Sequence, residues 1–445
     1  SLTTNVLGSK SVAVGQGSLS DQNPATAVDM FNVGVGFNVG ASVTTGTNNT
    51  LIGGLAGDAI TTGTSNNAVG YDALGATTTA NQNNAFGRNS LGSNTTGADN
   101  SAFGQNSLGA NTTASNNVAV GSDALAANTT GAGNTAVGTI ALDRCTTSSN
   151  NTAVGHEALT NMTGGAGNTA LGKGTMTGVV TGSNNTAVGL FALNANTDAS
   201  NNVAIGNNAL VANTTGATNT AVGQNALQAN TTAADNVGIG HSALEANTTG
   251  AANTALGKNS GKANTTGSSN VYLGRDTGIT GSPGGNNTGG NGAIFLGDEN
   301  IGDAHIQVDW TVASDARDKT DVEPIKTGLD FVNKLEPVTY RWDKRSKYGD
   351  KYADDYDLNA QTPDGTHKED WLDVGFLAQD VEKLEAEYSY NMQDNTNLAT
   401  RLSDDGKQYS LKYTKFIPSL VKAVQELSAQ VEELKTQPKC KCNEE

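Results

Sequence analysis

Ser314 and Lys319, five positions apart, are the residues with which covalent chemistry in this chain would begin. A serine hydroxyl is a poor nucleophile until a base accepts its proton. A lysine serves as that base only where burial or a neighbouring cation favours its neutral amine, because a solvated ammonium has no free lone pair. Arg317 either supplies the neighbouring cation or pairs with Asp315 or Asp318. An isolated segment of this kind is usually a solvated turn, so the elements around it must decide between the two interpretations.

Composition and charge change at Ser314. Residues 1–313 carry 7 Lys or Arg and 16 Asp or Glu, whereas residues 314–445 carry 19 and 27. The net charge of -17 is spread over both parts, so we expect no basic stripe that would neutralise the phosphates of a nucleic acid. The same charge predicts repulsion from anionic membrane surfaces, and without a run of 18 apolar residues we expect no membrane insertion.

The ends of the chain and its cysteines add little chemistry. The first residues lack the regions of a signal peptide, and the missing initiator methionine favours a processed chain or an excerpt from a longer one. Three cysteines make no disulfide framework, and Cys440-x-Cys442 without a nearby histidine is a weak metal signal. We therefore expect an unstructured tail, no metal and no cofactor.

A seventeen-residue repeat organises the part before Ser314. Glycine recurs at this spacing through thirteen steps, and an asparagine stands four positions before each of these glycines. The glycines are Gly53, Gly70, Gly87, Gly104, Gly121, Gly138, Gly155, Gly172, Gly189, Gly206, Gly223, Gly240, Gly257 and Gly274. Such a period indicates an array of stacked coils, whereas a disordered low-complexity tract, the alternative that the composition allows, does not need one. We expect Gly and Asn at left-handed corners, with Asn side chains that bond to the backbone or to the Asn one coil away.

Two apolar positions recur in each coil. We expect the residue before each glycine, such as Val69, Val120 or Ile205, to point inward from a short strand. The residue four positions after the glycine, such as Leu74 or Leu125, is expected on the opposite wall. Two thin rows bury little area at about 25 cal/mol per Å², so the sequence predicts a homotrimeric β-solenoid or β-roll in which other chains close the core.

The repeat units resemble the Asn-Thr-Ala-Val-Gly repeats of phage tail fibres and are similar to the head repeats of trimeric autotransporter adhesins. The resemblance covers residues 49–274 and implies left-handed parallel β-rolls in trimers. After Gly274 the register breaks, and the next comparable motif, at residues 294–297, comes 23 residues later. The alternating residues 305–312 then predict a strand that leads to Ser314.

Four motifs follow one another from Ser314 onward. They are Ser314-Asp315-x-Arg317-x-Lys319, LEPVTYRW at residues 335–342, VGFLAQDV at residues 374–381, and Leu411-x-Tyr413 before a C-terminal helix. In this order they resemble the endosialidase-type C-terminal intramolecular chaperone, a self-cleaving trimerisation domain of phage tailspikes and fibres. The resemblance implies that Ser314 is the nucleophile, Lys319 is the general base, and the bond between Ala313 and Ser314 is cut, with Asp315 and Arg317 in support.

Three helices are expected from residue 324 onward, and residues 375–384 are expected to run from a buried strand into the second of them. Residues 324–335 are expected to form a short amphipathic helix. The apolar residues of the last helix follow spacings of 3 and 4, which predicts a short coiled coil. They are Ile417, Leu420, Val424, Leu427, Val431 and Leu434. On the helix expected between these two, Asp380, Glu382 and Glu385 are interpreted as a solvated face rather than as paired catalytic carboxylates.

These observations predict a mainly β chain with five segments. An irregular N-terminal segment (1–48) precedes a β-solenoid shaft (49–280) and a connector (281–313) that ends at the cleavage site. A small α+β chaperone and autoprotease (314–416) and a coiled-coil helix with its tail (417–445) complete the chain.

The favoured function is that of a trimeric tail-fibre protein of a virion, which attaches to a host and removes its own chaperone in one turnover. Its expected partners are a cell-surface glycan or protein receptor and, through the N-terminal side, other tail or baseplate proteins. One alternative is a bacterial surface adhesin or structural fibre, extracellular or on the cell surface, with an uncleaved and inert cap. A glycan depolymerase is disfavoured, because the repeats hold few aromatic platforms or acid pairs.

Overall fold

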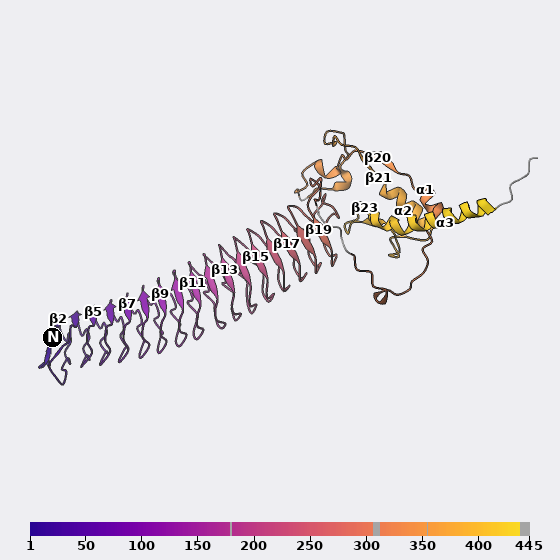
Figure 1. The fold of residues 1–445 in the computed structure, drawn as a ribbon. Helices are drawn as coiled ribbons and strands as arrows, with labels where there is room; N and C mark the ends of the chain where they lie inside the picture. The colour runs from indigo at the N-terminus through magenta and orange to yellow at the C-terminus, as the bar shows by residue number, and fades with distance from the viewer. Residues whose placement is uncertain (179, 306–311, 354, 437–445) are drawn as a thin grey trace, which may run out of the picture. The chain divides into compact units, whose positions relative to one another are not determined.

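The structure, a computed structural model, describes residues 1–178, 180–305, 312–353 and 355–436 (Figure 1). The chain divides into two compact units. One, which we call the shaft, comprises residues 1–276 and 289–294; the other, the C-terminal unit, comprises residues 277–288 and 295–445. The expected fold class, a long parallel β-solenoid with a small C-terminal α+β domain and a final helix, is confirmed.

The shaft is a ladder of three-residue parallel strands, one per coil, in a single row (Figure 1). Each strand pairs in register with the next, as Thr135, Ala136 and Val137 do with Thr152, Ala153 and Val154. The strands of this ladder are β2 (Val12–Val14), β4 (Val33–Val35), β5 (Thr50–Ile52), β6 (Asn67–Val69), β7 (Asn84–Phe86), β8 (Ser101–Phe103), β9 (Val118–Val120), β10 (Thr135–Val137), β11 (Thr152–Val154), β12 (Thr169–Leu171), β13 (Thr186–Val188), β14 (Val203–Ile205), β15 (Thr220–Val222), β16 (Val237–Ile239), β17 (Thr254–Leu256) and β18 (Val271–Leu273).

The strands of the shaft turn to its interior the face that we expected to point outward. In β11 the central Ala153 is fully buried, whereas Val154, directly before the glycine, is partly exposed. Successive strand residues point to opposite faces, so one register places only one of the two inside. The residue four positions after the glycine, such as Leu159, is also fully buried, and beside it the narrow interior accepts a methyl group. The prediction that the residue before the glycine points inward is therefore wrong, and this residue forms an outer row.

The glycine of each coil is required by both conformation and space. Gly155 has a φ of +136°, and a Cβ there would lie 2.5 Å from the carbonyl oxygen of Gly172 in the next coil. The buried leucine is left-handed as well, with φ of 51° at Leu159. This conformation costs a bulky residue about 1–3 kcal/mol, which complete burial of the side chain offsets.

The repeated asparagines form a buried hydrogen-bonded ladder. Asn168 Oδ1 accepts a hydrogen bond from the backbone N–H of Asn185 at 3.0 Å, and Asn168 Nδ2 donates to the carbonyl of Gly182 at 2.9 Å. Bonding to the backbone and to the Asn one coil away was expected. The left-handed corner, however, is the residue before the ladder Asn, such as Asn150 or Asn184.

The ladder begins before residue 49, so the expectation of an irregular segment over 1–48 is corrected. β2 pairs with β4 and β4 with β5 in the common register. Asn32 already accepts a hydrogen bond from Asn49 N–H at 2.9 Å. Gly36 lies 17 residues before Gly53, and the longer step between β2 and β4 hides the continuity. The short strands β1 (Gly8–Ser9) and β3 (Val28–Asp29) pair separately.

The C-terminal end of the shaft does not follow the expected boundary at residue 280. Residues 289–294 belong to the shaft, where Asn270 Oδ1 accepts a hydrogen bond from Ala293 N–H at 2.9 Å. Residues 277–288 belong to the C-terminal unit. β19 (Ile294–Leu296) lies at the division. Most of the strand expected over 305–312 lies outside the described residues.

The C-terminal unit packs three α-helices and two antiparallel strand pairs around one small core. Its elements are η1 (Ala316–Asp318), α1 (Leu329–Lys334), β20 (Val338–Tyr340), η2 (Arg345–Lys347), η3 (Leu358–Ala360), β21 (Asp373–Gly375), α2 (Ala378–Glu387), β22 (Thr400–Leu402), β23 (Tyr409–Leu411), η4 (Tyr413–Lys415) and α3 (Phe416–Thr436). β20 pairs antiparallel with β21, and β22 with β23. The core residues are Phe331, Val381, Leu384, Ala399 and Phe416.

The helix expected over 324–335 is shorter than predicted and is capped from α3. α1 begins only at Leu329, whose N–H donates to Glu426 Oε2 at 2.7 Å. Thr327 and Ser419 hydroxyls are 2.6 Å apart. The backbone before α1 is thus tied to α3 rather than helical. Among the described helices, none combines the length and hydropathy of a membrane-spanning segment.

Candidate active site

Ser314 and Lys319 are brought together by a single turn of 3-10 helix. Asp315 caps η1 by accepting a hydrogen bond from Arg317 N–H, and the turn places Lys319 directly after it. Lys319 Nζ lies 2.6 Å from Ser314 Oγ and 3.4 Å from the Ser314 carbonyl oxygen. The amine is therefore within direct proton-transfer distance of the hydroxyl.

Arg317 pairs with Asp315, one of the alternatives that the sequence left open. Its guanidinium approaches both carboxylate oxygens, with Nη2 at 2.6 Å from Oδ2 and Nε at 3.1 Å from Oδ1. The ion pair lowers the pKa of the Asp315 carboxyl and raises the pKa of Arg317. The pair lies within the turn that carries Ser314 and Lys319.

The candidate site is open to solvent in the single chain. Ser314, Asp315, Arg317 and Lys319 are all exposed. In the described part of the chain, their side chains find every hydrogen-bond partner within residues 314–319. The Ser314 hydroxyl and the Lys319 amine are in contact, but the exclusion of water that favours a neutral lysine is not supplied by this chain alone.

The other three motifs build the fold of the C-terminal unit rather than the candidate site. Tyr413 accepts a hydrogen bond from Phe376 N–H at 3.2 Å through its hydroxyl. A Cβ at Gly375 would lie 2.3 Å from that oxygen and 3.3 Å from the ring of Tyr340. Tyr340, Gly375 and Tyr413 come from three separate motifs, so the motifs specify one packed cluster.

Of the predicted carboxylates on α2, Asp380 lies on the surface and Glu385 is buried. Asp380 pairs with Lys383 on the surface. Glu385 is only 1% exposed, so the expectation of a solvated face is wrong for this residue. It accepts hydrogen bonds from Ala399 N–H at 2.7 Å, Thr400 N–H and the Thr400 hydroxyl. Glu385 directly follows Leu384, an apolar residue of the same helix, and this position was the feature of the sequence that could have predicted its burial.

Among the residues that the structure describes, the remaining cysteine and carboxylate groups do not gather into a second site. Cys145 is buried inside a coil, and this burial raises the pKa of its thiol. Within the described residues, no three His, Cys, Asp or Glu side chains gather as a metal site would require. Cys440 and Cys442 lie outside those residues.

Comparison with known proteins identifies the C-terminal part. Residues 314–390 match the family described as the chaperone of endosialidase, a self-cleaving intramolecular chaperone. The match begins at Ser314 and includes the first three motifs, whereas Tyr413 and α3 follow it. Neither curated proteins nor solved structures gave a match to the chain. A long β-solenoid followed by such a chaperone domain fits a tail-fibre-like protein.

Proposed function

We propose that this chain is a homotrimeric virion tail fibre whose C-terminal chaperone aligns three protomers and then cuts itself off before Ser314. The observation that carries the cleavage is the 2.6 Å contact of Lys319 Nζ with Ser314 Oγ at the first residue of the chaperone match. Asp315 and Arg317 act as positioning residues through their ion pair.

The proposed reaction is an acyl shift followed by hydrolysis. The neutral Lys319 amine takes the Ser314 hydroxyl proton as Oγ attacks the carbonyl carbon of Ala313. The C–N bond then breaks, and the Ser314 nitrogen takes the proton from Lys319 to become a free amine. A water molecule hydrolyses the resulting ester and leaves an Ala313 carboxylate. The products are residues 1–313 and 314–445, and the reaction occurs once per chain.

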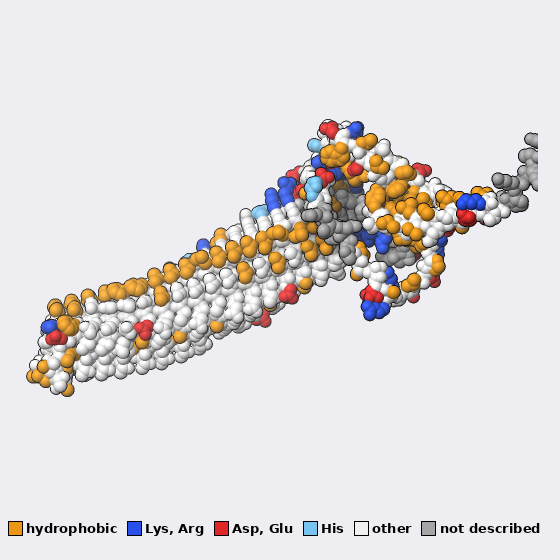
Figure 2. Space-filling view, viewed as in Figure 1, with side chains coloured by type: hydrophobic (Ala, Val, Ile, Leu, Met, Phe, Trp, Pro, Cys, Tyr) orange, Lys and Arg blue, Asp and Glu red, His pale blue; other side chains and the backbone are white. Residues whose placement is uncertain are grey.

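The outer row of the shaft supports association with further copies. It consists of the last residue of each ladder strand from β2 to β18. Figure 2 shows these apolar side chains as a continuous line along the shaft. Phe86 and Phe103 stack in it at 4.9 Å between ring centroids, and Leu256 is 51% exposed. An apolar surface of this length on a soluble chain indicates a contact face.

The row of heptad residues on α3, which we call the α3 seam, independently supports association with further copies of the chain. Its six heptad residues, from Ile417 to Leu434, are each between 41% and 65% exposed. Spacings of 3 and 4 place them on one helix face, which is the arrangement of a coiled-coil seam between copies of the chain. Since both a shaft row and a helix seam run along one chain, a parallel assembly of identical chains covers both.

Assembly also supplies what the candidate site lacks. Ser314 and Lys319 are exposed in one chain, and a lysine acts as a base when burial favours its neutral form. Packing of neighbouring protomers over residues 314–319 would exclude water there. Cleavage would then follow trimerisation and leave the shaft kinetically trapped without its registering domain.

Attachment to a host receptor by the shaft, and to other tail or baseplate proteins through its N-terminal side, completes this proposal. The alternative is a bacterial surface adhesin or structural fibre that keeps an inert cap. It predicts an uncut chain, so the two functions differ in one observable.

The test of assembly compares Leu427→Asp in the α3 seam with Ala429→Asp, an exposed residue outside it. Sedimentation should show three chains for the wild type and for Ala429→Asp, and uncut single chains for Leu427→Asp. A wild type that sediments as one chain, or a Leu427→Asp variant that trimerises and cuts normally, would overturn the coupling.

A further inference from the structure

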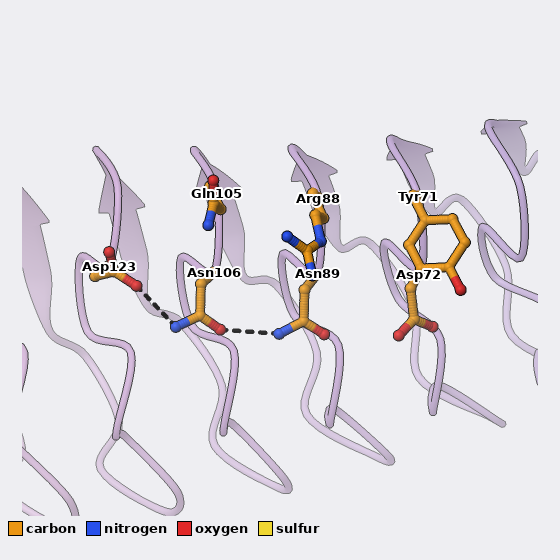
Figure 3. A pocket seen from close by; sticks show the side chains of 7 residues that line it. All are labelled: Tyr71, Asp72, Arg88, Asn89, Gln105, Asn106 and Asp123. Atoms are coloured by element: carbon orange, nitrogen blue, oxygen red, sulfur yellow. Dashed lines mark hydrogen bonds between the residues drawn. The ribbon is translucent and has the colours of Figure 1, made fainter.

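A shallow polar groove crosses four successive coils of the shaft (Figure 3). Two rows of side chains line it. The first row stands directly after the coil glycines and contains Tyr71, Arg88 and Gln105. The second row stands one position further on and contains Asp72, Asn89, Asn106 and Asp123.

The first row is not needed by the fold. Its side chains are exposed, and other coils place Thr139, His156 or Leu190 at the same position, whereas the structural Gly and Asn positions repeat unchanged. In the described residues, the Tyr71 hydroxyl, the Arg88 guanidinium and the Gln105 amide make no side-chain hydrogen bond. These three groups are therefore available to a ligand.

One end of the second row, at Asp72 and Asn89, presents acceptors that receive no hydrogen bond within the described residues. Asn89 Nδ2 donates to Asn106 Oδ1, and Asn106 Nδ2 donates to Asp123 Oδ1, both at 2.9 Å (Figure 3). This direction leaves Asn89 Oδ1 on the side of Asp72, and two acceptors cannot bond to each other. Within the described residues neither oxygen group receives a hydrogen bond, so a ligand there must bring O–H or N–H donors.

Three glycines lie against the side chains of the second row. Three consecutive coils carry Gly75, Gly92 and Gly109 five positions after the coil glycine, where other coils carry residues such as Asp58 and Asp143. A Cβ at these glycines would lie 2.0, 2.3 and 2.2 Å from the Oδ1 atoms of Asp72, Asn89 and Asn106. None of the three has a positive φ, so the backbone does not require glycine there. Their coincidence with the groove marks these coils as distinct.

The mixture of groups fits a neutral sugar. The Tyr71 ring lies beside Gly54 of the preceding coil and stays 56% exposed, which offers an apolar face to a sugar ring. The amide and carboxylate oxygens accept from hydroxyl groups, while Arg88 and Gln105 donate to them. Two aspartates against one arginine disfavour a polyanion. Four coils about 4.8 Å apart span roughly 14 Å, room for a short oligosaccharide.

We propose that this groove binds a neutral, hydroxyl-rich saccharide, with Tyr71 as the stacking platform and Asp72 and Asn89 as the hydroxyl acceptors. The proposal rests on the proposed host attachment and gives it a ligand class and a location.

The test uses the full chain and a panel of gluco-, galacto-, manno- and rhamno-configured trisaccharides, with sialylated trisaccharides beside them, followed by saturation-transfer NMR titration. Three variants are compared: Tyr71→Ala, Gly92→Asp, and the control Gln224→Ala, an exposed glutamine at the first-row position of another coil. Gly92→Asp copies the aspartate that other coils hold at this position and places a side chain against Asn89 Oδ1. We expect a neutral trisaccharide to bind wild type and Gln224→Ala alike and about tenfold more weakly to the two groove variants.

Binding of sialylated sugars alone, equal binding by all variants, or no binding from the panel would each overturn the inference. Adsorption of labelled fibre to a panel of bacterial strains separates this failure from failure of the host-attachment proposal. Adsorption that groove variants leave unchanged overturns the saccharide site only. Absence of adsorption by wild type to every strain overturns host attachment.

Discussion

The shaft and the C-terminal unit use buried polar side chains in opposite ways. In the shaft the same Asn contact recurs from coil to coil, as between Asn168 and Asn185. In the C-terminal unit Glu385 ties α2 to the start of β22 through hydrogen bonds that no repeat shares. Stacked repeats depend on their neighbours, whereas a small domain folds around one core. Damage should therefore stay local in the shaft and spread through the C-terminal unit.

The largest expected effect is that of Glu385→Ala, which would sharpen this contrast. It leaves two backbone N–H groups and one hydroxyl without their partner, and each buried group costs about 1–3 kcal/mol. Hydrogen exchange should show loss of protection throughout α2, β22 and β23. Glu387→Ala, which removes only an exposed ion pair with Lys334, serves as the control. Protection that falls only next to residue 385 would break the comparison.

A smaller, local effect is expected from Asn168→Ala. The change unpairs the Asn185 N–H and the Gly182 carbonyl, again at about 1–3 kcal/mol each. Exchange should accelerate in the neighbouring coils and stay unchanged around Gly257. Asn207→Ala, at a partly exposed position, should alter neither region. Uniform loss of protection along the shaft would show that its coils unfold as one unit.

The smallest effect concerns Cys145, where one coil departs from its neighbours. Cys145 follows Asn128 by one coil, and the buried Asn128 Oδ1 receives no hydrogen bond from the residues that the structure describes. Burial also raises the pKa of the Cys145 thiol, so it stays protonated above the pH at which an exposed thiol ionises. Iodoacetamide at pH 8 should leave the Cys145 peptide unmodified until the chain is unfolded. Rapid alkylation in the folded protein would show that this coil opens.

The sequence predicted the stacked coils but not which residues of each strand point inward. The spacing of Gly53 to Gly274 identifies one strand per coil, because a repeated backbone needs its special conformation at a repeated place. In Ala153-Val154 both residues are apolar, so alternation alone does not say which points inward. Size favoured valine, yet the buried Leu159 leaves room only for alanine. The left-handed position before each ladder Asn was missed, since Ser65, Gln82 and Asp99 share no residue type.

The sequence indicated the two residues of the candidate site, but not how the residues around them are arranged. The chaperone-like motifs pointed to Ser314 and Lys319, and a single turn of η1 joins them. The partner of Arg317 stayed open because Asp315 and Asp318 are both close in sequence, and the cap geometry favours Asp315. Glu385 was misjudged since its partners, in residues 399–400, are distant in sequence.

Intact-mass spectrometry of freshly expressed protein tests the central claim most directly. Wild type is measured beside Ser314→Ala and Lys319→Ala, with Asp318→Ala as a control in the same turn. The account predicts fragments of residues 1–313 and 314–445 for wild type and Asp318→Ala, and whole chains for the two dyad variants. A wild-type chain that stays whole as a trimer, or a cut Lys319→Ala variant, would contradict self-cleavage by Ser314 and Lys319.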